Sequence, residues 1–250
     1  MHLSVIIPSY NEEKRITKTL KDIDKYLSKQ DYDYEIMVVS DGSRDRTAEM
    51  VRSLMPGIKN LRLIGGKKNR GKGYSVRQGL LLAKGEFRLF TDADNSTSIN
   101  QVEKIWPYLK GVCPEPAEGY DIVIGSRDIK GAVLDPPQPW LRNAVLGEGF
   151  KLFRKVVIGL WGIEDTQCGF KCFTKRVAEN VSPKCRIDHF AFDPEMLIVA
   201  QKLGYKIKEI PVYWKNDLDS KVKIGSMIKM AFDLFIIRKN LISHAYDKKN

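Results

Sequence analysis

The stretch EIMVVSDGSRDRTAEMVRSL, residues 35–54, contains the unit that decides the fold. Its apolar run, residues 36–39, predicts a buried strand. A turn at Asp41 and Gly42 follows, and RTAEMVRSL then predicts a helix. Strands that alternate with helices of this length are typical of parallel sheets, in which a right-handed crossover joins neighbouring strands. The unit therefore predicts an α/β protein.

The same alternation extends to both sides of this unit. Upstream, residues 4–8 form a short β-branched run, and Asn11 is the expected cap of a helix that follows. The apolar residues of that helix repeat at helical spacing: Ile16, Leu20, Ile23 and Leu27. Downstream, the alternation continues over residues 61–65, 77–85, 86–94 and 120–128. We therefore expect a mostly parallel sheet flanked by helices.

Polar residues follow each of the predicted strands at the point where it ends. In parallel sheets, ligands bind at the carboxyl ends of the strands. The residues that the sequence places there are Pro8–Glu12, Asp41–Ser43, Asp92–Asp94 and Gly125–Arg127. The carboxyl edge of the sheet is therefore the expected position of the functional site.

The charge of the chain favours anionic partners. Its 250 residues include 42 Lys and Arg against 31 Asp and Glu, which gives a formal net charge of +11. Such a balance attracts nucleic acid, phosphorylated small molecules or an anionic membrane surface, and it is equally compatible with a solvated, lysine-rich surface. Charge alone leaves these alternatives open.

Several classes of protein are excluded by the composition. The four cysteines, Cys113, Cys168, Cys172 and Cys185, lack the spacing of a zinc site and are expected to be reduced, buried thiols. The three histidines are too scattered for a catalytic triad. We expect no secretion signal, since Pro8 interrupts the first apolar run, and no membrane-spanning segment.

Asp92 and Asp94 stand one residue apart where a predicted strand ends. Two carboxylates there can hold a divalent cation that completes its shell with water and substrate phosphates. The simpler interpretation is an Asx turn that ends the strand. Taken alone, this pair does not decide between the two.

Two further features suit a phosphorylated ligand. Residues 69–79, NRGKGYSVRQG, place glycines beside Arg70 and Lys72 before a helix, an arrangement that suits a phosphate but also describes an ordinary basic loop. Asp41 is placed to accept hydrogen bonds from a base or a ribose, or else to cap a turn. Combined with the acidic pair, these features predict a pocket for a nucleoside diphosphate.

The ordered set of segments SVIIPSYNEE, VVSDGSRDRT, NRGKGYSVRQG, FTDADNST and IGSRD resembles the nucleotide-sugar-binding half of an inverting, family 2 glycosyltransferase of GT-A fold. Two later segments, DTQCGFKCF and FAFDPEML, resemble the polyprenyl-phosphate hexose synthases. Within these, dolichyl-phosphate glucosyltransferases are the nearest group and dolichyl-phosphate mannose synthases are close behind. The resemblance extends to about Trp214.

The resemblance implies a Rossmann-like GT-A domain over residues 1–223, with a nucleotide-sugar half at 1–128 and an acceptor half at 129–223. A C-terminal amphipathic helix and basic tail would occupy residues 224–250. The implied activity is inverting transfer of glucose from UDP-glucose to dolichyl or polyprenyl phosphate, with Mg²⁺ or Mn²⁺ as cofactor. The alternatives are GDP-mannose as donor, or a saccharide hydroxyl as acceptor.

The resemblance also implies roles for individual residues. The positions expected to bind the nucleotide sugar are Pro8, Tyr10, Glu12, Val39, Asp41, Lys72, Asp92 and Ala93. The metal would lie on Asp92 and Asp94, and the acceptor phosphate on Arg127, Arg142 and Lys171. The residues expected to be catalytic are Asp94, Arg127 and Asp193. Gln167, Asp193 and Glu195 would face the sugar or stabilise the loop that does, and a hydroxyl acceptor would need Asp193 or Glu195 as its base.

Two departures from the family pattern matter. Some mannose synthases carry a glutamine as an extra metal ligand where this chain has Ser96, so the metal should depend more on Asp92 and Asp94. Integral relatives carry transmembrane helices as anchors, which we do not expect in this sequence. We therefore expect a cytoplasmic protein that is peripheral on the cytoplasmic face of a membrane, docked through residues 145–163 and the C-terminal helix. That helix is as compatible with packing on the core, and no nucleic-acid partner is expected.

Overall fold

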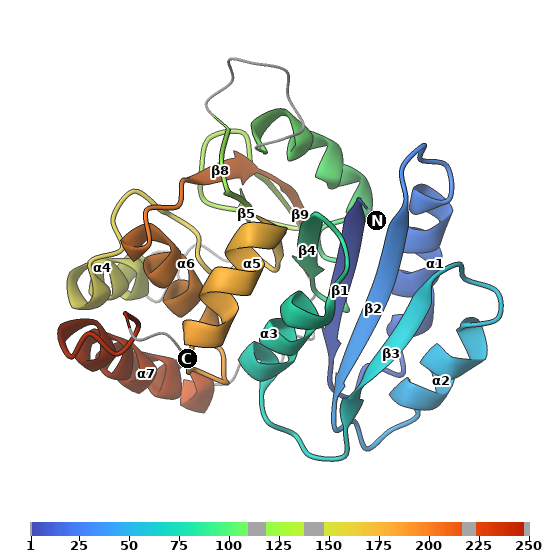
Figure 1. Ribbon diagram of the computed structural model, residues 1–250, viewed down its shortest axis with the longest axis horizontal. Coiled ribbons are helices and arrows are strands. Elements are labelled where there is room, and N and C mark those ends of the chain that lie inside the picture. The colour runs from blue at the N-terminus through green and yellow to red at the C-terminus, as the bar shows by residue number, and fades with distance from the viewer. Residues whose placement is uncertain (1, 110–118, 138–147, 217–223, 248–250) are drawn as a thin grey trace.

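The computed structural model describes residues 2–109, 119–137, 148–216 and 224–247 (Figure 1). Its centre is a seven-stranded sheet in the order β3-β2-β1-β4-β7-β5-β8. All neighbouring strands are parallel except β7, which is antiparallel to both β4 and β5. The strands are β1 Leu3–Ser9, β2 Tyr34–Asp41, β3 Leu61–Gly66, β4 Phe87–Thr91, β5 Ile122–Ser126, β7 Phe170–Thr174 and β8 Ile207–Pro211. The predicted α/β fold with a mostly parallel sheet is confirmed.

The sheet has a hydrophobic core on each face, because successive side chains of a strand point to opposite sides. Ile6 and Met37 belong to the core beneath α3, α5 and α6, whereas Val5 and Ile36 belong to the core beneath α1 and α2. Figure 1 shows α3 and α5 on the near face. The helices are α1 Ile16–Leu27, α2 Thr47–Leu54, α3 Lys72–Leu82, α5 Lys175–Val181 and α6 Phe192–Lys202, with short 3₁₀ helices at Ile99–Lys104, Trp106–Tyr108 and Ser182–Lys184.

The first helix confirms the predicted apolar spacing but not the predicted cap. Its residues at helical spacing, Ile16 to Leu27, are fully buried. Asn11 does not cap α1, because backbone turns from Glu12 lead into a helix whose N-cap position is Arg15. Asn11 has a positive φ of 55°, and its side-chain oxygen accepts the backbone N–H of Arg44 at 2.9 Å. It therefore joins the loop after β1 to the loop after β2.

The later part of the chain adds a small two-stranded sheet, and also two helices that lie at one end of the molecule (Figure 1). Strands β6 Val133–Asp135 and β9 Tyr213–Lys215 pair in parallel. Helices α4 Glu148–Ile158 and α7 Ile224–Ile242 pack together, with Phe153 and Phe235 in edge-to-face contact at 5.6 Å (Figure 1).

Helix α7 is part of the main core. Met230, Leu234 and Ile237 on one side of it are buried in the same cluster as Phe192 of α6, and Tyr246 just beyond its end is buried there as well. The structure thus places the start of α7 at Ile224 and packs this helix on the core, which is one of the two alternatives expected for it. The further division of the chain into a nucleotide-sugar half and an acceptor half stays a prediction.

Two expectations from composition can be compared with the described residues. Cys168, Cys172 and Cys185 are free and buried, as predicted, while Cys113 lies outside the described residues. Burial raises the pKa of the Cys168 thiol to about 12, which keeps it protonated near neutral pH. In the described part of the chain, no helix combines the length and apolar character needed to cross a bilayer.

Candidate active site

Asp41, at the end of β2, shapes the glycine-containing loop before α3. Its two carboxylate oxygens accept the backbone N–H groups of Arg70 at 2.7 Å and of Gly71 at 2.8 Å. Gly71 has φ of 117°, and a Cβ there would lie 2.2 Å from the carbonyl oxygen of Asp188, so no other residue fits. Asp41 therefore fixes the position from which α3, and its first residue Lys72, begin.

The acidic pair lies where β4 ends, in contact with that lysine. Lys72 Nζ lies 2.6 Å from Asp92 Oδ1. On the other side, Gly169 packs so closely that a Cβ on it would lie 2.0 Å from Asp92 Oδ2. Asp94 Oδ1 accepts the backbone N–H of Ser96 at 3.0 Å, which forms the predicted Asx turn. The turn and a ligand-binding pair of acids are thus compatible interpretations of the same residues.

The electrostatics of this cluster are those of an acidic site with too little positive charge. Burial and the neighbouring charge of Asp92 raise the pKa of Asp94. Burial alone would lower the pKa of Lys72, but the carboxylates of Asp92, Asp193 and Asp94 outweigh it and raise that pKa. A divalent cation between the two aspartates would relieve their repulsion.

A second lysine, on β7, is paired with a carboxylate of the same cluster. Lys171, on β7, is buried, and its Nζ lies 2.6 Å from Asp193 Oδ1 on the first turn of α6. Both ammonium groups lie near the Phe90 ring, whose centre is 5.2 Å from Lys72 Nζ and 5.3 Å from Lys171 Nζ. Burial raises the pKa of Asp193, and Lys171 and Lys72 oppose that rise. Strands β4 and β7 and helices α3 and α6 thus meet in one charged cluster.

Arg127, just after β5, makes a paired ion contact with Asp165. Its Nε and Nη2 lie 2.6 and 2.9 Å from the two carboxylate oxygens, and its backbone N–H is 3.0 Å from Asp165 Oδ2. Burial would raise the pKa of Asp165, but the guanidinium and these hydrogen bonds hold it well below its usual range. The guanidinium also lies over the Trp214 ring, 4.8 Å from its centre. Arg127 is therefore held rigidly at the edge of the site.

Asp165 also organises the loop that precedes β7. Its Oδ1 accepts the backbone N–H groups of Gln167 at 2.9 Å and Cys168 at 3.1 Å. Glu209 on β8 accepts the backbone N–H groups of Glu164 and Asp165 at 2.8 and 2.9 Å. The carboxylates of Asp165 and Glu209 thus hold this loop in place by accepting hydrogen bonds from its backbone N–H groups. Asp41, at the end of β2, holds the loop before α3 in the same way.

The comparisons with known proteins agree with this architecture. The family model described as glycosyl transferase family 2 matches residues 4–181, more than half of the chain. The chain belongs to this family. A dolichyl-phosphate β-glucosyltransferase of Trichomonas vaginalis is 40% identical over 240 residues, which cover 94% of this chain and 70% of that protein. The human protein of the same description is 35% identical over 252 residues, covering 98% and 77%.

A solved structure supports the fold of this glycosyltransferase. Glucosyl-3-phosphoglycerate synthase from Mycobacterium tuberculosis, in complex with Mn²⁺, UDP and glucosyl-3-phosphoglycerate, superposes with a TM-score of 0.64 at 16% identity. The likeness covers 100% of this chain and 81% of that one. It confirms the GT-A fold predicted from the sequence.

The predicted nucleotide-sugar and metal-binding residues of the glycosyltransferase lie in more than one place at this edge of the sheet. Lys72, Asp92 and Asp94 come together in the cluster described above, with Asp193 beside them. At the end of β1, Pro8 is buried, Tyr10 is exposed and Glu12 is paired with Arg15 at 2.8 Å. Asp41 and Ala93 lie at the same edge of the sheet, and the carbonyl oxygen of Ala93 accepts the Thr19 hydroxyl at 2.7 Å.

Three predicted roles need correction or fall outside the description. The side chain of Val39 is buried in the core under α3, so only its backbone could contact a nucleotide. The Lys171 ammonium is buried against Asp193, so it supports that carboxylate and offers no surface to an acceptor phosphate. Arg142 lies outside the described residues.

Glu195 holds a loop and does not face a sugar. It is fully buried and accepts the backbone N–H groups of Arg186 and Ile187 at 2.8–3.0 Å, and the Tyr246 hydroxyl at 2.8 Å. Burial raises the pKa of Glu195, and these donors oppose the rise. Of the two roles predicted for it, the structure therefore supports stabilising the loop that leads into α6.

Sequence reasoning missed Asp165 and Gly169, which support Arg127 and Asp92. Asp165 could have been found from a local signal. Its side-chain oxygen accepts the backbone N–H of Gln167, two residues later, and this Asx turn is one that the segment DTQ favours. Gly169 carries no such signal, since its requirement arises from the approach of β7 to Asp92.

Proposed function

We propose that this glycosyltransferase transfers glucose from UDP-glucose to dolichyl or another polyprenyl phosphate, with inversion at the anomeric carbon. Relatives at 40% and 35% identity over nearly the whole chain are named dolichyl-phosphate β-glucosyltransferases, which favours glucose over mannose. The observation that carries the proposal at the level of the site is the Lys72–Asp92–Asp94 cluster at the carboxyl edge of the sheet.

The residues of the cluster fit a divalent cation. Asp92 and Asp94 supply hard oxygen ligands, and the pKa of Asp94 is raised by burial and by repulsion from Asp92, which a cation would relieve. In the described residues no group of three or more Asp, Glu, His or Cys side chains could hold a metal, so the donor's diphosphate and water would complete the shell. When bound, Mg²⁺ or Mn²⁺ would neutralise charge that develops on the leaving nucleoside diphosphate.

The chain's own residues position the two anionic reactants. Lys72, held at the start of α3, adds a cation beside the place of the diphosphate. Arg127 has Nε and Nη2 engaged by Asp165, and its Nη1 group donates to no acceptor in the described residues, so that group is the part available to the acceptor phosphate. An acceptor phosphate is already largely ionised at neutral pH, so positioning replaces a general base.

The buried carboxylates argue against a saccharide hydroxyl as acceptor. That reaction needs a carboxylate base within reach of the hydroxyl. Glu195 is fully buried and engaged by three donors, and Asp193 is 4% exposed and paired with Lys171. Neither is placed to take a proton from a sugar.

A donor and acceptor panel tests the proposal. The full chain is incubated with UDP-glucose, GDP-mannose or UDP-GlcNAc, with a polyprenyl phosphate or a free saccharide, and with Mg²⁺, Mn²⁺ or EDTA. Lipid-linked glucose should form from UDP-glucose and polyprenyl phosphate alone, and EDTA should abolish it. Transfer to the saccharide, or a preference for GDP-mannose, would contradict the proposal.

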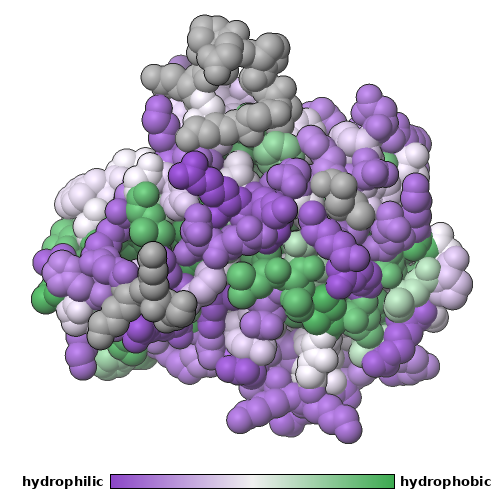
Figure 2. All heavy atoms as spheres, viewed as in Figure 1, coloured by the Kyte–Doolittle hydropathy of each residue, from purple (hydrophilic) through white to green (hydrophobic). Residues whose placement is uncertain are grey.

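We also propose that the protein docks on the cytoplasmic face of a membrane as a peripheral protein. Figure 2 shows apolar areas among polar ones at the end formed by α4 and α7, and a broader apolar area over α3 and the strands beside it. The large exposed apolar side chains at the α4 and α7 end are Leu152, Val156, Trp161, Ile228, Phe232, Phe235, Ile236 and Ile242. Lys229, Arg238 and Lys239 of α7 are exposed among them. A mixed apolar and cationic face suits an anionic leaflet.

Two matched substitutions locate the docking face. Leu152→Ser on α4 and Leu82→Ser on α3 remove the same side chain from positions that are 60% and 46% exposed. Leu152→Ser should weaken cosedimentation with anionic vesicles by roughly tenfold, because it withdraws about 1.5 kcal/mol of apolar burial in the membrane. Leu82→Ser should have no effect, and the reverse result would place the docking face over α3.

A further inference from the structure

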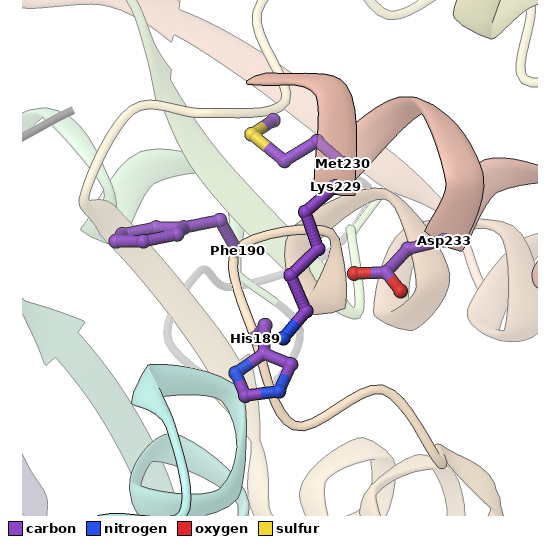
Figure 3. A pocket seen from close by; sticks show the side chains of 5 residues that line it. All are labelled: His189, Phe190, Lys229, Met230 and Asp233. Carbon is purple, nitrogen blue, oxygen red and sulfur yellow. The ribbon is translucent and has the colours of Figure 1, made fainter. Parts of the chain in front are cut away.

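A hollow between α7 and the turn before α6 has no part in the site described above. It is lined by His189, Phe190, Lys229, Met230 and Asp233. In Figure 3, Lys229 and Asp233 reach from α7 toward the turn that carries His189 and Phe190. The hollow therefore combines two groups that can donate hydrogen bonds, one carboxylate and two apolar side chains.

Asp233 is the unusual member of this group. It is only 7% exposed, and its buried Oδ2 has no hydrogen-bond partner in the described part of the chain. His189 and Lys229 act on it through their charge, and neither donates a hydrogen bond to it. A buried carboxylate oxygen without a donor is costly, so its side of the hollow favours a ligand that brings a hydroxyl group.

The chemistry of the hollow suits a phosphate monoester. The Lys229 ammonium and a ring N–H of His189 can donate to its anionic oxygens. Burial raises the pKa of Asp233, while His189 and Lys229 oppose that rise, so its carboxyl group can share one proton with a phosphate oxygen. A ligand without a proton to share, such as a sulfate ester, would leave the Asp233 oxygen unsatisfied.

The surroundings of the hollow suit an apolar chain attached to that phosphate. Ile228 is 55% exposed and Phe232 is 65% exposed, and Ile236 continues the same stripe one turn later. Phe232 follows Lys229 by three residues, so the two share a side of α7. The stripe thus begins where the polar hollow ends.

The hollow also adjoins the loop that positions the candidate active site. The His189 ring lies against Gly71, since a Cβ on that glycine would lie 2.8 Å from His189 Nδ1. Gly71 is the residue that Asp41 holds and that precedes Lys72. A ligand in the hollow would therefore lie beside the start of α3.

We propose that this hollow is a holding subsite for an isoprenyl phosphate, with the phosphate on Lys229, His189 and Asp233 and the chain along Ile228, Phe232 and Ile236. This inference rests on the proposed function, because the isoprenyl phosphate is the acceptor of that reaction. It adds a second phosphate position to the one expected at Arg127, and it gives α7 a direct part in acceptor binding.

A pair of lysine substitutions tests the subsite. Lys229→Met and Lys239→Met remove the same exposed ammonium group from the same helix, once at the hollow and once away from it. The probes are geranyl phosphate, geraniol and inorganic phosphate, titrated into the full chain by calorimetry. Lys229→Met should weaken geranyl phosphate binding about tenfold or more, as loss of a charged hydrogen bond does, and Lys239→Met should leave it unchanged.

The remaining arms identify the ligand. Geraniol should bind wild type and both variants equally weakly, and inorganic phosphate should show the same dependence on Lys229 as geranyl phosphate at lower affinity. Equal effects of the two substitutions on geranyl phosphate would overturn the subsite. Loss of binding to phosphatidic acid vesicles in Lys229→Met, with unchanged binding of geranyl phosphate, would also overturn it and assign the hollow to a membrane headgroup.

Failure of the subsite and failure of the proposed function are separable. If wild type transfers glucose to geranyl phosphate but Lys229→Met binds that acceptor normally, the subsite is wrong and the function stands. If wild type binds geranyl phosphate through Lys229 but transfers no glucose to it, the function is wrong and the subsite stands.

Discussion

The two sides of the sheet's carboxyl edge use the same kinds of charged residue in different ways. On the side of β4 and α3, the Lys72 and Asp92 side chains are 26% and 19% exposed. On the side of β5 and β7, Asp165, Lys171 and Asp193 are 2–5% exposed. Exposed charges can exchange their partner for a ligand, whereas buried ones must keep it. The first side is therefore placed to bind, and most of the second is placed to support.

The largest expected effect comes from a substitution on the binding side, and it should reduce activity without reducing stability. Asp94→Asn keeps the oxygen that accepts the Ser96 N–H but removes the charge that a divalent cation needs. Transfer from UDP-glucose should fall on the order of 1,000-fold, comparable with the loss of a main electrostatic group in other active sites. The melting temperature should stay the same or rise slightly, since a like charge beside Asp92 is lost.

The matched control for Asp94→Asn is Asp31→Asn in an exposed loop, which should change neither rate nor melting temperature. Retention of full metal-dependent transfer by Asp94→Asn would show that Asp94 does not hold the metal.

The next largest effect comes from a substitution on the supporting side, and it should reduce stability. Asp165→Asn removes the buried partner of Arg127, and the free energy of unfolding should fall by about 3 kcal/mol. The folded-state pKa of Asp165 is depressed, so the stability that its charge contributes is fully present above its unfolded pKa of about 4. It is lost as pH falls through the depressed value. The difference between wild type and variant, measured by urea unfolding, should therefore narrow as pH is lowered below about 4.

A surface pair provides the control for that experiment. Asp128→Asn removes a partner of Lys151, 3.0 Å away, from a pair whose side chains are 18% and 31% exposed. It should cost less than about 1 kcal/mol. If Asp165→Asn costs no more than Asp128→Asn, Arg127 is not held by a buried ion pair and its assigned rigidity is wrong.

A third substitution tests whether Lys171 supports or binds. Lys171→Met fills a similar volume but leaves Asp193 buried without its partner, so the protein should lose about 2–3 kcal/mol of stability. The KM for polyprenyl phosphate should change little in protein that remains folded, because the ammonium group is not on the surface. Lys175→Met, in an exposed pair with Glu86 at 3.6 Å, should change neither quantity. A large rise in KM with normal stability would restore the predicted phosphate role.

The fold was predictable because its signals are local, and the supporting side was not because its signals are distant. The apolar spacing of Ile16 to Leu27, the strand at residues 36–39 and the acids after β4 are each contained within a few residues. By contrast, the partner of Lys171 is 22 residues away, and that of Arg127 is 38 residues away. A sequence shows which residues are charged, but burial decides whether a charge binds a ligand or another side chain. For this reason the sequence left two roles open for Glu195 and could not show that Lys171 pairs with Asp193.

The smallest expected effect tests how firmly α7 is joined to the supporting side. Tyr246→Phe removes the hydroxyl that donates to buried Glu195, whose other contacts hold the loop before α6. The variant should lose about 1–2 kcal/mol, because one acceptor oxygen of a buried carboxylate loses a donor. Tyr205→Phe is the matched control, since its hydroxyl accepts from Asn180 at 2.8 Å in an exposed pair and its loss should cost less than about 0.5 kcal/mol. Equal melting temperatures for the two variants would mean that the end of α7 is not tied to Glu195, and that the helix is free to move on a membrane without disturbing the site.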